Sequence, residues 1–200
     1  MRIAVIGTGN VGVALGRGWA RAGHEVIWGS RRPDATGDVT PVAGIGAAAD
    51  GADAVVLAVP SDALGDTIAA LGAVHGRVII DATNTLGKPP PDGATSGAAH
   101  LATLAEGASV VKAFNTMGWE TMADPMIDGR RAVCFVCGDD PAARSLAAQL
   151  GRDLGFEAVD AGDLEAARHI ESLASFWVHL AFRTELGRKF AFALLHRSGG

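Results

Sequence analysis

The 200-residue sequence lacks a long apolar run, a basic surplus and a second pair of cysteines. No stretch approaches the roughly 18 uncharged apolar residues that a membrane helix needs. The opening residues MRIAVI end at a glycine and are too short for the core of a signal peptide. The net charge of −5 argues against a nucleic-acid or anionic-membrane partner. We therefore expect a globular cytoplasmic protein with one sizeable core.

The two cysteines of the chain, Cys134 and Cys137, stand in the run AVCFVC. Their C-x-x-C spacing can indicate a redox or zinc site. The run is β-type, however, and side chains three residues apart on a strand point to opposite faces. No second cysteine pair exists to complete a metal site, and the six histidines show no metal-ligand spacing. The sequence therefore predicts two buried thiols and no metal.

Short β-type runs alternate with helical runs rich in alanine and leucine along most of the chain. Strands are expected at 2–7, 25–29, 53–60, 77–84, 109–115, 132–138 and 156–162, and helices at 10–22, 44–51, 62–73, 98–106 and 141–154. Near-continuous apolar strands separated by helices indicate a sheet covered on both faces. The predicted fold class is α/β, a Rossmann-type doubly wound and mostly parallel sheet.

Two regions depart from this alternation. The proline- and glycine-rich segment 87–97 is expected to be an exposed loop, and the last part of the chain has helical character only. We therefore expect a domain at 1–160 and, at 161–200, a C-terminal pair of helices. An apolar stripe at helical spacing, formed by Ile170, Leu173, Trp177 and Leu180, predicts that this extension covers its own domain or a second subunit. A homodimer is the expected assembly.

A glycine motif closes the first expected strand and opens the first helix. In AVIGTGNVG, the pattern G-x-G-x-x-G is formed by Gly7, Gly9 and Gly12. Gly7 permits the tight turn, Gly9 lets the backbone approach a pyrophosphate, and Gly12 lets helix and strand pack closely. The amides at the helix start, with the positive end of the helix dipole, then bind phosphate. The motif predicts a dinucleotide site.

The end of the second expected strand indicates which dinucleotide is bound. An NAD-preferring site has an Asp or Glu there, which binds the adenosine ribose hydroxyls. This chain has Gly29, Ser30, Arg31 and Arg32 in that place. A small residue, a hydroxyl and two guanidinium groups would accommodate a 2′-phosphate, which a carboxylate would repel. The coenzyme predicted is NADP(H).

With both motifs established, the chain resembles the coenzyme F420-dependent NADP oxidoreductase family and the cytosolic NADPH domain of the six-transmembrane metalloreductases. The motifs that carry the resemblance are GTGNVG, GSRR, AVP, VVKAFNTMG and CGDDP, and it extends over essentially the whole chain. The terminal segment ESLASFWVHLAFRTELGRKFAFALL is similar to that of a subgroup of predicted dinucleotide-binding enzymes. The cofactor motifs are specific, whereas the substrate motifs are not.

The resemblance implies roles for particular residues. Contacts to the pyrophosphate would come from Thr8, Gly9, Asn10 and Val11, and contacts to the 2′-phosphate from Ser30, Arg31 and Arg32. The path toward the nicotinamide would be lined by Ala58, Val59 and Pro60, and its ring framed by Thr83, Asn84, Asn115, Thr116, Met117 and Gly118. The family has a His-Thr-x-Pro arrangement where this chain has residues 115–118. That departure bears on the deazaflavin and not on the nicotinamide coenzyme.

No proton relay can be assigned from the sequence, and the catalytic residues are left unassigned. Lys112 stands at a strand end, while Glu171 and Trp177 read as structural helix residues, as does His169. The absence of a relay fits hydride transfer between stacked rings, where the protein supplies position.

We expect an NADP(H)-dependent oxidoreductase whose hydride partner is a flavin-like or deazaflavin (F420) molecule. Two alternatives stay open. One is an NADPH-dependent reductase of a small carbonyl, imine or metal chelate, and the other is a non-catalytic NADPH sensor.

Overall fold

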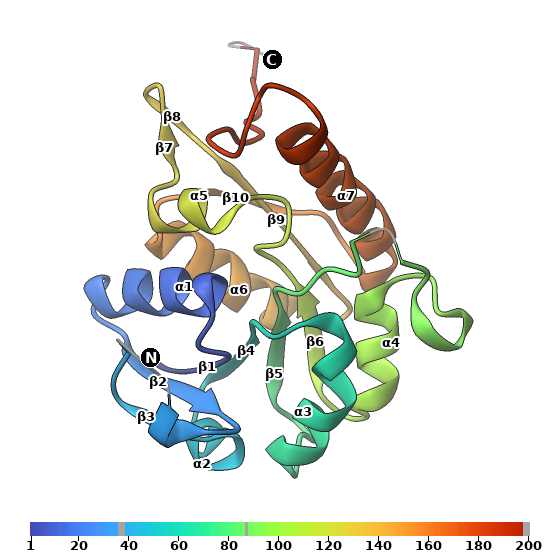
Figure 1. Ribbon diagram of the computed structural model, residues 1–200. Helices are drawn as coiled ribbons and strands as arrows, with labels where there is room; N and C mark the ends of the chain where they lie inside the picture. The colour runs from blue at the N-terminus through green and yellow to red at the C-terminus, as the bar shows by residue number, and fades with distance from the viewer. Residues whose placement is uncertain (36–38, 87, 198–200) are drawn as a thin grey trace.

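The computed structural model describes residues 1–35, 39–86 and 88–197. One eight-stranded sheet has the order β10-β9-β6-β5-β4-β1-β2-β3 (Figure 1). Its strands are β1 (Arg2–Ile6), β2 (Glu25–Ser30), β3 (Val42–Gly44), β4 (Ala54–Leu57), β5 (Val78–Asp81), β6 (Ser109–Lys112), β9 (Val133–Gly138) and β10 (Glu157–Asp160). The α-helices are α1 (Asn10–Arg21), α2 (Ile45–Ala49), α3 (Leu64–Leu71), α4 (Gly97–Leu104), α5 (Trp119–Ala123), α6 (Pro141–Asp153) and α7 (Ala167–Arg183). The predicted Rossmann-type α/β fold is confirmed.

The sheet is parallel except at one junction. Neighbouring strands from β3 to β6 run parallel, as β9 and β10 do, but β9 is antiparallel to β6. The connection between β6 and β9 contains only the five-residue helix α5 and a small hairpin of β7 (Met126–Ile127) and β8 (Arg130–Arg131). Neither is long enough to carry the chain back across the sheet, so β9 returns in the opposite direction. The predicted mostly parallel sheet is confirmed, with this antiparallel pair, β3, α5 and the hairpin as unforeseen additions.

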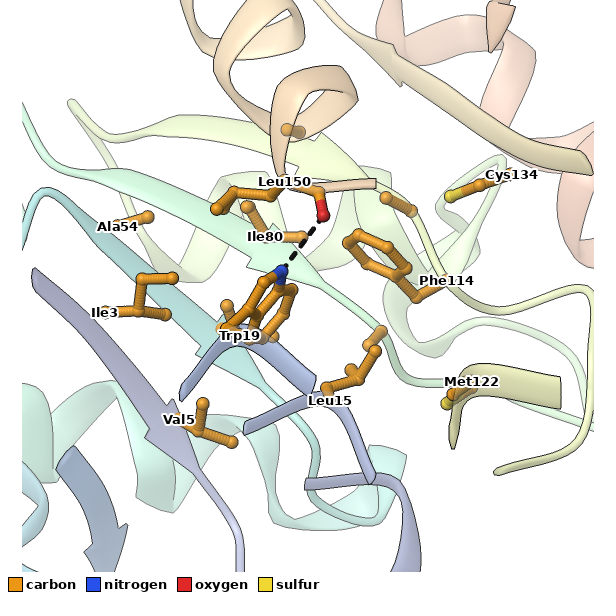
Figure 2. Close-up of a cluster of buried hydrophobic side chains, with 14 of the residues drawn as sticks. Ile3, Val5, Leu15, Trp19, Ala54, Ile80, Phe114, Met122, Cys134 and Leu150 are labelled. Carbon is orange, nitrogen blue, oxygen red and sulfur yellow. Dashed lines mark hydrogen bonds between the residues drawn. The ribbon is translucent and has the colours of Figure 1, made fainter. Parts of the chain in front are cut away.

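Apolar side chains form a core on each face of the sheet. Along β1, Ile3 and Val5 face the cluster under α1 and α6, while Ala4 and Ile6 face the cluster under α2, α3, α4 and α7. Figure 2 shows the first cluster, in which the fully buried Trp19 donates its indole N–H to the Leu150 carbonyl at 3.0 Å. Burial on both faces explains why the strands are almost entirely apolar.

The cysteines behave as the alternation predicts. Cys134 belongs to the cluster under α1 and α6, and Cys137 belongs to the cluster on the opposite face. Both are buried free thiols, and burial raises the pKa of each to about 12. The prediction of two buried thiols is confirmed.

The C-terminal region contains the expected helix but not the expected pair. α7 ends at Arg183, and the described residues 184–197 form no second helix. In this segment Phe190 stacks on Trp177, with ring centroids 5.3 Å apart. The Phe192 carbonyl also accepts a hydrogen bond of 2.9 Å from the Val133 amide. The prediction of a second helix is therefore wrong. A helix at 185–195 would lose the hydrogen bond between Phe192 and Val133 of β9.

α7 packs against α4 and β9 of its own chain. The stripe predicted on α7 is directed inward, since Ile170 and Trp177 are buried while Leu173 and Leu180 are partly buried. Of the loop predicted at 87–97, the segment 88–95 is mostly exposed, as expected, but Ser96 and Gly97 are buried at the start of α4. Residue 87 of that loop and residues 198–200 of the predicted extension lie outside the described ranges. Within those ranges no helix is long and apolar enough to cross a membrane.

Candidate nucleotide-binding site

The carboxyl ends of β1, β2 and β4 meet around a cavity of about 250 Å³. Its lining combines the three segments that the sequence singled out: Gly7, Thr8 and Gly9; Gly29, Ser30, Arg31 and Arg32; and Ala58, Val59 and Pro60, with Ile6, Ile45, Ala63 and Thr67 completing the wall. In an open α/β sheet, ligands bind at the carboxyl ends of the strands where the strand order reverses. β1 lies at such a point, because β2 and β4 flank it on opposite sides.

The glycine loop is compact on one side and open on the other. Gly7 has a φ of 122°, and a Cβ there would collide with the Ala58 carbonyl oxygen. A Cβ on Gly12 would collide with the Gly7 carbonyl oxygen. A Cβ on Gly9, in contrast, would meet no heavy atom within 4 Å. Gly7 and Gly12 are therefore packed against backbone, and of these three glycines Gly9 is the one with open space beside it.

The start of α1 can bind an anion. Among the described residues no side chain caps this helix, and its first turn holds no acidic residue. Val13 donates the first helical hydrogen bond, to the Gly9 carbonyl at 2.9 Å. The amides of Asn10, Val11 and Gly12 precede that bond, and such N-terminal amides are donors for a phosphate group. The residues present thus fit a dinucleotide pyrophosphate.

The turn after β2 presents two cations. The Arg32 amide donates to the Ser30 hydroxyl at 3.1 Å, which shapes the turn. Both Arg31 and Arg32 are exposed and line the cavity beside the glycine loop. Exposed guanidinium groups can close on an incoming phosphate without first breaking a buried interaction.

The residues predicted to frame a nicotinamide lie at the ends of β5 and β6, outside the lining of the cavity. Asn84 and Asn115 form an amide pair: Asn84 Nδ2 donates to the Asn115 carbonyl at 2.8 Å, and Asn115 Nδ2 donates to Asn84 Oδ1 at 3.1 Å. Thr83 and residues 115–118 are buried, while Asn84 is partly buried. The structure therefore brings the two asparagines together at the ends of β5 and β6. In the sheet these two strands lie next to β4, on the side away from β1 and β2.

Sequence reasoning did not foresee an ion network beneath this amide pair. Lys112 is fully buried and forms ion pairs with Asp81 and Glu171. The two strands concerned, VIID and SVVK, each end in a charged residue directly after a run of apolar residues, and that contrast was the available signal. Trp177 also lies in this region, because its ring is 2.9 Å from the position that a Cβ on Gly118 would occupy. His169 is exposed on α7.

The sheet and the glycine loop define a dinucleotide-binding Rossmann protein. A family model described as NADP oxidoreductase coenzyme F420-dependent matches residues 2–85. An F420-dependent NADP reductase of Methanothermobacter thermautotrophicus is 33% identical over 216 residues, covering 93% of this chain and 91% of that protein. The chain therefore belongs to the F420-dependent NADP oxidoreductase family, whose members are NADP-dependent oxidoreductases.

Two further likenesses agree with the family. The crystal structure of a candidate F420-dependent NADP reductase from an Arthrobacter species has a TM-score of 0.83 and 32% identity, and covers 98% of this chain and 100% of that one. The metalloreductase STEAP3 of Rattus norvegicus is 28% identical over 177 residues, which are 86% of this chain. The match spans only 36% of that metalloreductase.

Two alanine substitutions distinguish a glycine that the packing of α1 requires from a glycine that the ligand requires. We expect Gly12→Ala to lower the free energy of unfolding by about 1–3 kcal/mol, because its Cβ meets backbone. Gly9→Ala should change stability by no more than about 0.5 kcal/mol, yet weaken NADPH binding roughly tenfold or more. Thermal denaturation and calorimetric titration measure the two effects. Unchanged coenzyme affinity in Gly9→Ala would mean that the phosphates do not approach this residue.

Proposed function

We propose that this protein transfers hydride between NADPH and a flavin-like or deazaflavin acceptor, with F420 as the first candidate. The observation that carries the proposal is the cavity in which the glycine loop of β1 faces the two arginines that follow β2. The relatives named F420-dependent NADP reductase, which match over nearly the whole chain, support the same choice.

At the adenosine end, the residues of this chain bind the coenzyme and orient it. The amides at the start of α1 hold the pyrophosphate, while Ser30, Arg31 and Arg32 hold the 2′-phosphate. Ala58, Val59 and Pro60 form the opposite wall and direct the coenzyme toward the ends of β5 and β6. These assignments rest on the shape of the cavity and on the charges that line it.

At the nicotinamide end, we propose that residues 83–84 and 115–118 frame the ring. These residues are Thr, Asn, Asn, Thr, Met and Gly, and none of them ionises near neutral pH. Bound NADPH itself supplies the hydride. Hydride transfer to a flavin or deazaflavin ring leaves an anion delocalised over the ring, which takes its proton from water, so the protein has mainly to align the two rings. Reduction of a ketone leaves a localised alkoxide and also requires a proton donor beside it. The composition of this end therefore favours a ring-shaped acceptor.

An assay with several acceptors tests the proposal. We expect NADPH to reduce F420, FMN or FAD without added metal, measured as loss of absorbance of the oxidised acceptor. NADH should be a poor substitute, because it lacks the phosphate that the arginines bind. No turnover with any of these acceptors, despite tight NADPH binding, would contradict the proposal. Turnover of an imine, a carbonyl or a ferric chelate in their place would identify the alternative reductase.

The double variant Arg31→Ala with Arg32→Ala tests coenzyme choice. Each arginine is expected to contribute near the lower end of the range for hydrogen bonds to charged groups, because solvent and salt screen exposed cations. NADPH binding should weaken roughly 100-fold, while NADH binding changes less than about threefold. Calorimetric titration measures both, and the preference for NADPH should shrink as salt rises.

The chain contains its own control for this experiment. Arg130 and Arg131 form a second exposed arginine pair, on β8 and away from the cavity. Replacing both by alanine removes the same charge and should leave both affinities unchanged. Equal losses for NADPH and NADH in the Arg31/Arg32 variant would show that those arginines are structural.

We further propose that residues 161–200 act as an extension that also forms a homodimer in the cytoplasm. Phe176 and Phe182 on α7 are 53% and 58% exposed, and such apolar side chains favour an interface. Light scattering at micromolar concentration should give twice the chain mass, and Phe176→Lys with Phe182→Lys should halve it. Met126→Lys, at an exposed apolar position on β7, is the control. A monomeric wild-type protein would exclude the dimer.

A further inference from the structure

Three charged side chains meet in the interior where β5, β6 and α7 converge. Lys112 Nζ lies 2.9 Å from Asp81 Oδ2 and 3.2 Å from Glu171 Oε1. Asp81 and Lys112 are fully buried, and Glu171 is 7% exposed. Removing charges from water is costly, and the cost is offset only when each charge is paired and hydrogen-bonded. Hydride transfer as proposed makes no direct use of any of the three.

The network holds the backbone that follows β5. Lys112 Nζ donates to the Thr83 carbonyl at 2.6 Å, and the Thr83 amide donates to Asp81 Oδ1 at 2.9 Å. Both polar backbone groups of Thr83 are therefore held by buried charged side chains. The next residue is Asn84, which exchanges hydrogen bonds with Asn115. The ion network and the amide pair are thus connected through one residue.

Glu171 ties the same network to the start of α4. Its Oε2 accepts from the Gly97 amide at 2.9 Å, and its Oε1 accepts from the Ala98 amide at 3.1 Å. Two carboxylates and one ammonium leave one surplus negative charge, and the amides at a helix N-terminus stabilise such a charge. The Glu171 carboxylate therefore links the Lys112 ammonium to the first amides of α4.

Lys112 remains a cation near neutral pH. Burial alone would lower the pKa of Lys112, but Asp81 and Glu171 outweigh that effect and the pKa lies above its ordinary value. Its ammonium group contacts Asp81, Glu171 and the Thr83 carbonyl. Its contribution is a fixed position.

We propose that Asp81, Lys112 and Glu171 are positioning residues that set the Asn84–Asn115 amide pair to receive the carboxamide of the nicotinamide ring. The inference rests on the proposed function, because it places the nicotinamide at this end of the site. A carboxamide has an N–H donor and a carbonyl acceptor, and an asparagine side chain complements both. Asn115 Oδ1 is buried and has no hydrogen-bond partner among the described residues, so an acceptor is available for the ligand N–H.

Glu171→Gln tests this role, because it removes one charge while preserving shape. Calorimetric titration compares NADPH with 2′,5′-ADP, which has the adenosine half and its phosphate but no nicotinamide. We expect NADPH binding to weaken roughly tenfold and 2′,5′-ADP binding to change less than about twofold. Asp81→Asn removes a charge at the other end of the network and should produce the same split if Glu171→Gln does not fold.

The matched control is Ile170→Ala, which deletes buried apolar volume one residue earlier on the same helix. It should lower the melting temperature and leave the ratio of the two affinities unchanged. Equal losses for both ligands in Glu171→Gln, or no loss for NADPH, would overturn the positioning role. Wild-type protein that binds NADPH no more tightly than 2′,5′-ADP would instead contradict the nicotinamide site of the proposed function, so the two failures are distinguishable.

Discussion

The close approach of backbone to backbone in the glycine loop is the constraint on which the nucleotide site depends. Gly7 lies against the Ala58 carbonyl, and Gly12 lies against the Gly7 carbonyl. Side chains at these two positions would push α1 away from β1 and β4, and the helix amides would no longer point into the cavity. Close packing inside a protein makes such a displacement costly, since neighbouring groups relax only in part. The geometry of the phosphate site therefore follows from the absence of two Cβ atoms.

The two ends of the site use charge in different ways. Arg31 and Arg32 are exposed, so water and salt screen them and they cost little while no ligand is bound. Asp81, Lys112 and Glu171 are buried, where each charge requires a partner and the geometry is correspondingly fixed. Exposed cations suit recognition of a phosphate that enters from solvent. A buried network suits the inferred task of holding two asparagines in one arrangement.

Much of the fold was predictable because local patterns and tertiary packing agree. Apolar runs such as RIAVI and AVVL became strands whose residues are buried on both faces, and the helical segments between them formed where expected. The unforeseen parts depend on contacts distant in sequence. The direction of β9 is set by the short connection from β6, which no pattern within VCFVCG reveals. The segment 184–197 has apolar residues that suit a helix, yet it is not helical, because Phe190 stacks on Trp177 and the Phe192 carbonyl accepts a hydrogen bond from Val133 of β9.

The candidate site likewise has one part that was predictable from the sequence and one part that depends on tertiary contacts. The glycine spacing and the arginines after the second strand stand within short stretches of chain, so the sequence alone was enough to predict a phosphate-binding loop and a preference for NADP(H). The tertiary structure alone decided that the isolated charges ending two apolar strands would meet Glu171 of α7, many residues away, in the interior. The physical reason is that a buried charge is stable only beside its partner, and the partner here is supplied by packing of α7 on the sheet rather than by neighbours in sequence.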